Sequence, residues 1–94
     1  MCKFELGQTV TTRGVAGKIE NDPKFEIFIR ESFKAYAVGD WGMLDEEDKQ
    51  SNDEALKNGG MILAAYIYPV DGTKIWIITE WDRSVTTILF PEEY

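Results

Sequence analysis

The fold is decided by residues 61–91, MILAAYIYPVDGTKIWIITEWDRSVTTILFP, which contain three apolar runs separated by short polar breaks. The runs at 61–68, 74–81 and 85–90 are rich in β-branched and aromatic residues and have the length of strands. The first break contains an Asp-Gly pair at 71–72, which supplies the positive φ of a tight hairpin turn. Because both breaks are too short for a parallel crossover, the three strands are predicted to pair in sequence as an antiparallel meander.

The middle run is apolar on both faces in its first half. Ile75 and Ile77 alternate with Trp76 and Ile78, so neither face of this strand suits contact with water. We therefore expect the strand to be central and covered twice, with Trp76 buried. One cover must be helical, because the chain has only one other good strand candidate. The second cover is either another helix or a partner molecule.

The residues before 61 predict one more strand and a long amphipathic helix. Residues 4–12 contain a β-branched run and are expected to add a strand at an edge of the meander, whereas 15–21 are assigned to a loop. Asp22 and Pro23 have the character of a helix cap and a first helical residue, so a helix is predicted from there to about residue 38. Its apolar stripe is expected to form core: Phe25, Phe28, Ile29, Phe33, Tyr36 and Ala37.

A second, polar helix is predicted over residues 44–58, at the periphery, with a break near Gln50 suggested by the capping-box pattern of Ser51 and Glu54. The predicted architecture is then β-α-α-β-β-β. This is a single α+β domain over residues 1–94, with an antiparallel sheet of about four strands and helices packed on one face.

Composition and charge restrict the class of partner. Ten Lys and Arg face seventeen Asp and Glu, and the net charge of −7 disfavours direct binding to nucleic acid. The sequence shows neither a signal peptide nor an apolar stretch long enough to span a membrane, so we expect a cytoplasmic protein without membrane association. The single cysteine, Cys2, can close no internal disulfide.

Most of the negative charge lies in residues 40–54, where seven carboxylates and one base, Lys49, give a net charge of −6. Because the segment lacks the ligand spacing and central glycine of a calcium loop, we expect no metal and no cofactor. It is either a solvated helix whose first turn favours acids or a surface for a basic protein partner, with a weak metal site as the alternative that we favour least. The residues of that predicted surface are Asp40, Trp41, Asp45, Glu46, Glu47, Asp48, Asp53 and Glu54, with Trp41 serving either as a core residue or as an exposed anchor.

A second candidate site is a pocket near Trp41 formed by Glu80, Trp81 and Arg83, which would suit a small-ligand or enzymatic domain. Glu80 and Arg83 are also expected to form an ion pair across their turn. The chain has no histidine, no phosphate-binding glycine loop and no nucleophile elbow. Catalysis would therefore depend on carboxylates alone, and we assign no catalytic residue and favour a non-enzymatic function.

The segments GDWG at 39–42, KIWIITE at 74–80, DRS at 82–84 and FPEEY at 90–94 resemble a group of small uncharacterised bacterial proteins often carried on plasmids and phages. The similarity covers roughly residues 36–94, and the group has no established activity. What the resemblance implies is a mobile-element context, in which small acidic proteins commonly bind and block host defence proteins such as restriction enzymes or CRISPR effectors. Whether a second copy of the chain covers the free face of the sheet, as a homodimer, stays open.

Overall fold

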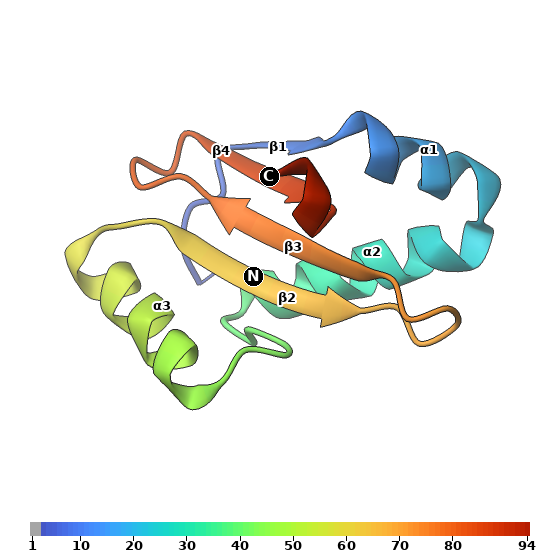
Figure 1. The fold of residues 1–94 in the computed structure, drawn as a ribbon. Helices are drawn as coiled ribbons and strands as arrows, with labels where there is room; N and C mark the ends of the chain where they lie inside the picture. Colours follow the sequence, from blue (N-terminus) through green and yellow to red (C-terminus); the bar gives the residue numbers. More distant parts are fainter. Residues whose placement is uncertain (1–2) are drawn as a thin grey trace.

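The computed structural model describes residues 3–94, so Cys2 lies outside the described residues. Along the chain the elements are β1 (Gln8–Thr11), α1 (Arg13–Asn21), α2 (Pro23–Ala37), α3 (Glu46–Asn58), β2 (Ile62–Ile67), β3 (Lys74–Thr79), β4 (Val85–Leu89) and the 3-10 helix η1 (Pro91–Glu93) (Figure 1). The strands form one sheet in the order β1-β4-β3-β2. The predicted α+β class with a four-stranded sheet is confirmed.

The three C-terminal strands form the predicted meander. Ala65 of β2 lies opposite Trp76 of β3, and Ile77 of β3 lies opposite Ile88 of β4, in antiparallel pairs. β1 also adds at an edge, as expected, but it runs parallel to β4. The prediction of a purely antiparallel sheet is therefore wrong. The short-connection argument applies only to consecutive strands, and β1 and β4 are separated by most of the chain, so no turn constrains their relative direction.

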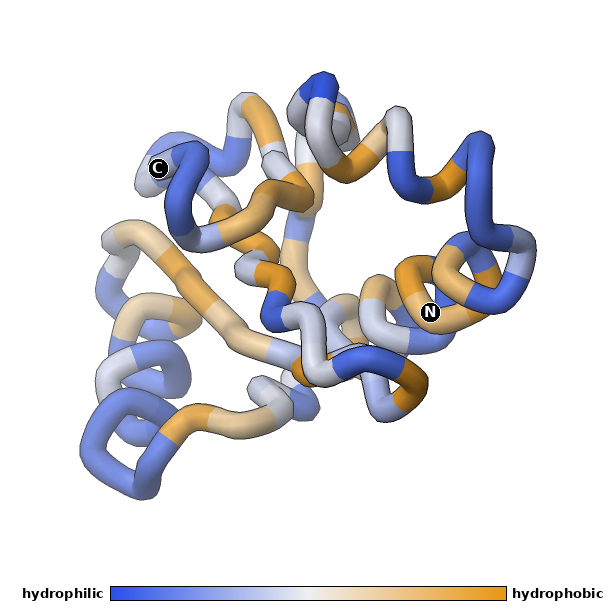
Figure 2. The backbone as a smooth tube through the Cα atoms, turned by 45° about the vertical axis from the view of Figure 1, so that its right-hand side comes forward, coloured by the Kyte–Doolittle hydropathy of each residue, from blue (hydrophilic) through white to orange (hydrophobic). Residues whose placement is uncertain are grey.

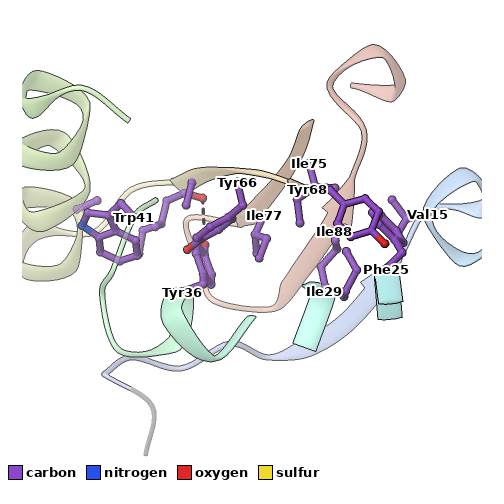
Figure 3. Close-up of a cluster of buried hydrophobic side chains, with 13 residues drawn as sticks. Val15, Phe25, Ile29, Tyr36, Trp41, Tyr66, Tyr68, Ile75, Ile77 and Ile88 are labelled. Atoms are coloured by element: carbon purple, nitrogen blue, oxygen red, sulfur yellow. Dashed lines mark hydrogen bonds between the residues drawn. The ribbon is translucent and has the colours of Figure 1, made fainter. Parts of the chain in front are cut away.

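Helix α2 covers one face of the sheet and begins where the sequence predicted. The Asp22 carboxylate accepts hydrogen bonds from the amides of Lys24 and Phe25 at 3.1 and 3.2 Å. From this start, Phe25, Ile29 and Tyr36 are buried against the strands (Figure 3). The apolar stripe thus forms the core of the domain, together with Ile75, Ile77 and Ile88 of the sheet.

Residues 13–21 form helix α1, where the sequence predicted a loop. The Thr12 hydroxyl accepts the amide of Val15 at 3.4 Å, and Val15 is completely buried. The Lys18 ammonium lies 2.8 Å from the Asp71 carboxylate and 5.2 Å from the centre of the Phe25 ring. A short helix with a weak intrinsic tendency is here stabilised by tertiary contacts, which a local pattern does not reveal.

Helix α3 lies beside β2, at an edge of the sheet rather than on its face (Figure 1). It runs unbroken from Glu46 to Asn58, so the predicted break near Gln50 is wrong. Asn52 is buried, and its side-chain amide both donates to the carbonyl of Leu63 at 2.7 Å and accepts its N–H at 3.3 Å. These are the two bonds that a further strand would make, so Asn52 joins α3 to the outer edge of β2.

Within residues 3–94, the cover over the second face of the sheet is η1 and Tyr94. The Tyr94 ring meets the Trp76 ring edge to face, with centroids 5.7 Å apart. Trp76 is consequently only partly buried, and the expectation of a buried Trp76 is wrong. The reason is that this cover is a single short turn and not a helix long enough to span the sheet.

Candidate functional site

The acidic segment predicted from the sequence forms an exposed surface around α3. The helix is hydrophilic along almost its whole length (Figure 2). Glu47 and Glu54 are seven residues apart and therefore lie on the same side of the helix, turned away from the buried Asn52. All seven carboxylates are exposed, and none takes part in an ion pair within residues 3–94: Asp40, Asp45, Glu46, Glu47, Asp48, Asp53 and Glu54.

Three of these carboxylates have structural roles. Asp40 accepts a backbone amide in its own turn at 3.2 Å, and Asp45 caps the start of α3 by accepting another at 2.9 Å. Asp53 accepts the indole N–H of Trp41 at 3.1 Å. The other four carboxylates accept no hydrogen bond from the part of the chain that the structure describes: Glu46, Glu47, Asp48 and Glu54. Their negative charge is therefore free to act on another molecule.

Trp41 belongs to the core. Its side chain is 3% exposed and meets the ring of Tyr36 edge to face, with centroids 5.6 Å apart (Figure 3). The core interpretation of Trp41 is confirmed, and its inclusion in the predicted partner-binding surface is corrected. Gly42, with φ 71°, lets the following backbone come close to β2, where the amide of Met43 donates to the carbonyl of Ala65 at 2.8 Å. This close approach encloses the indole.

The structure does not bring Glu80, Trp81 and Arg83 together with Trp41 in one pocket. Trp81 is 70% exposed, whereas Trp41 is enclosed. Arg83 turns its guanidinium toward backbone carbonyl groups and donates to that of Glu80 at 3.1 Å, not to its carboxylate. The expected ion pair between these two residues is therefore wrong. Arg83 donates instead to several backbone carbonyl oxygens at once, those of Ala55, Gly60 and Glu80. The single carboxylate of Glu80 does not offer the guanidinium as many acceptors.

A hollow of about 270 Å³ lies on the second face of the sheet, beside η1. Glu80 contributes to its wall, and Trp81 and Arg83 do not. Glu93, also in the wall, accepts the Thr12 hydroxyl at 2.6 Å and the Phe90 amide at 2.9 Å. These two hydrogen bonds lower the pKa of Glu93 and commit its carboxylate to holding η1 in place. Sequence reasoning missed this role, because Thr12 and Glu93 lie at opposite ends of the chain.

Within residues 3–94, no cluster of three or more His, Cys, Asp or Glu side chains is arranged to hold a metal ion. None of the helices in this part of the chain has the length and apolar character needed to cross a membrane. Comparisons with protein-family models, with curated proteins and with solved structures find no match to this chain.

Proposed function

We propose that this is a non-enzymatic binding protein that uses the exposed carboxylates of α3 to engage a basic surface on a partner protein. One observation supports this most directly. The carboxylates of Glu46, Glu47, Asp48 and Glu54 are exposed and make no hydrogen bond or ion pair with any group of residues 3–94. A concentrated field of one sign accelerates encounter with a partner of opposite charge and opposes partners of like charge.

The way α3 is attached supports the same proposal. Its buried side is fixed to β2 through Asn52, and its outer side makes no contribution to the core. The charges are thus presented on a rigid support, which lowers the entropic cost of ordering the surface on binding. A partner can use all of this outer side without disturbing the fold.

The partner class follows from charge and from the resemblance described above. A net charge of −7 repels phosphate backbones, so the partner is a protein. We place the interaction in the cytoplasm, with a basic host defence protein as the partner. The acids of α3 would occupy a basic groove of the kind that otherwise holds nucleic acid.

Charge neutralisation tests this proposal. The test variant carries Glu46→Gln, Glu47→Gln, Asp48→Asn and Glu54→Gln, and the matched control changes four exposed acids elsewhere, Glu5, Glu20, Glu31 and Glu92, to Gln. Partners are captured from host lysate at low and high salt, identified by mass spectrometry, purified and titrated. We expect the test variant to stay folded and to bind with an association rate lower by roughly tenfold or more and with a weaker salt dependence. The control should bind like the parent.

The outcome separates the acidic surface from the alternative of a ligand pocket. Unchanged affinity in a folded test variant would contradict the proposal and leave the four carboxylates as solvated surface. A function based on Glu80, Trp81 and Arg83 would survive neutralisation of α3, and that survival is the result that separates the two hypotheses.

A further inference from the structure

Trp81 leaves most of its indole in water, unlike the other two tryptophans. It is 70% exposed, whereas Trp41 is 3% exposed and Trp76 is partly covered by Tyr94. Within residues 3–94, the Trp81 side chain makes no hydrogen bond and no aromatic contact. Exposed tryptophan is uncommon on a folded surface, and this residue type is enriched among the side chains that contribute most to protein–protein binding.

The turn that carries Trp81 is held by hydrogen bonds on the C-terminal side of the tryptophan. Arg83, with φ 61°, donates to the carbonyl groups of Gly60 and Glu80 at 2.6 and 3.1 Å. The Asp82 carboxylate accepts both the amide and the hydroxyl of Ser84, at 3.0 and 2.6 Å. The backbone that follows Trp81 is therefore ordered before any partner arrives. Burial of the indole then requires less loss of conformational entropy.

Arg83 also places Trp81 next to the acidic helix. One guanidinium donates to the carbonyl of Trp81 at 3.4 Å and to the carbonyl of Ala55, in α3, at 3.0 Å. The β3–β4 turn and the C-terminal end of α3 accordingly lie at the same end of the sheet (Figure 1). Met61, which follows Gly60 at this end, is 45% exposed. Two exposed apolar side chains thus lie at the C-terminal end of α3, the end that carries Glu54, whereas Glu46, Glu47 and Asp48 lie in the first turn of the helix, about 10–14 Å away along its axis.

We infer that Trp81 is the apolar anchor of the interaction surface whose charged part is α3, and that the partner is a basic protein surface with an apolar pocket beside its lysines and arginines. This inference rests on the proposed function and adds what the partner must contain. Charge complementarity favours a basic protein over nucleic acid or an anionic membrane as the partner. Nucleic-acid bases can stack on an indole, but the carboxylates along α3 repel their phosphates, and they also repel the anionic headgroups of a membrane.

Two synthetic peptides of equal length and equal charge test the inference. One alternates lysines with serines, and the other has leucines in place of the serines along one side. Fluorescence anisotropy of each labelled peptide, titrated with the full chain, gives the two affinities. We expect the lysine–leucine peptide to bind about tenfold more tightly, because the leucines cover the indole. Trp81→Ala should abolish this preference without changing the affinity for the lysine–serine peptide, and Trp81→Phe should keep part of it.

The matched control is Val70→Ala, which removes a 64% exposed apolar side chain from the β2–β3 turn, at the opposite end of the sheet. It should keep the full preference for leucine. If Trp81→Ala keeps the preference, or Val70→Ala abolishes it, the inference is overturned while the acidic surface stands. The α3 charge-neutralised variant should bind both peptides more weakly. If it binds both as the parent does, the proposed function fails, and this inference fails with it.

Discussion

The guanidinium of Arg83 donates a hydrogen bond to the carbonyl oxygen of Ala55 at 3.0 Å, across 28 residues of sequence. Ala55 lies in the last turn of α3, and its carbonyl also accepts the amide of the cap residue Gly59 at 2.9 Å, so Arg83 is a second donor to it. A cation at this end of a helix is also favoured by the helix dipole. Arg83 therefore fixes the polar helix to the β3–β4 turn. This bond matters because α3 has few apolar contacts that could hold it against the rest of the domain.

Replacing Arg83 with Met should lower the free energy of unfolding by about 1–3 kcal/mol, because several carbonyl oxygens lose a charged donor while the aliphatic stem is kept. Urea denaturation measures the loss. Arg13→Met is the control, since Arg13 is exposed and its side chain makes no hydrogen bond within residues 3–94. Equal stability of the two variants would show that Arg83 does not hold α3.

A buried chain of hydroxyl groups predicts coupled effects on stability. Thr86 donates to the carbonyl of Leu6 at 2.6 Å, so Thr79 donates to Thr86 at 2.8 Å and Tyr36 donates to Thr79 at 2.7 Å. The carbonyl of Ile62, at 3.3 Å, is a longer second acceptor for the Tyr36 hydroxyl. Burial raises the pKa of Tyr36 to about 12, which keeps its proton in place at ordinary pH. Tyr36→Phe should cost about 1 kcal/mol. Thr79→Val should cost more, because it removes a partner from two buried hydroxyl groups.

A double-mutant cycle on Tyr36→Phe and Thr79→Val checks this order of hydrogen bonds. The loss in the double variant should be smaller than the sum of the two single losses, because both changes remove the same bond. Strictly additive losses, measured by chemical denaturation, would argue against a direct bond between the two hydroxyl groups.

A comparison of Gly42→Ala with Gly72→Ala separates two effects of adding a Cβ to a glycine: the steric collision with neighbouring atoms and the cost of a positive φ. Both have positive φ, 71° and 78°. A Cβ at Gly42 would collide with the carbonyl oxygen of Ala65, whereas a Cβ at Gly72 would meet nothing within 4 Å. Gly72→Ala should therefore cost only about 1–2 kcal/mol, for the left-handed backbone. Gly42→Ala should lower the melting temperature far more, and similar melting temperatures for the two variants would contradict the close approach to β2.

The hydrogen bonds of Glu93 predict that η1 stabilises the fold less at acid pH than at neutral pH. Its pKa is lower in the folded chain than the ordinary 4.5, so its contribution to stability is present above that pH and is lost as the pH falls through the lowered value. Glu93→Gln should be less stable than the parent at neutral pH and should lose less stability on acidification. Thermal melts from neutral to acid pH measure this, with Glu92→Gln as the control that keeps the parent profile. A parent-like profile for Glu93→Gln would exclude the carboxylate as the group that holds η1.

Local signals were sufficient to predict the parts of the fold that depend on neighbours in sequence. Asp22 and Pro23 start α2 where expected, and the alternating apolar runs give the meander its strands. The direction of β1 and the existence of α1 depend on contacts with distant residues, such as that between Lys18 and Asp71. No pattern within a short window contains that information.

The candidate site divides in the same way. The exposure of the α3 acids follows from the cost of burying unpaired charge, so the sequence predicts it. The fates of the tryptophans do not follow from residue type. Trp41 is drawn into the core by the close backbone path at Gly42, and Trp81 is exposed because β3 ends at Thr79, before the apolar run itself ends. Both outcomes depend on backbone geometry that is set elsewhere in the chain.

The contact between Asn52 and Leu63 also limits how this protein can assemble with itself. Because the Asn52 amide and the Met43 N–H already occupy outward-facing backbone groups of β2, another strand cannot readily dock there. At the opposite side of the sheet, β1 has no neighbouring strand within residues 3–94. A molecule with a single accessible edge can pair with one copy of itself and then stop. Growth of a fibril by edge-to-edge addition needs an accessible edge on each side of the sheet. By blocking the edge of β2, Asn52 opposes such growth.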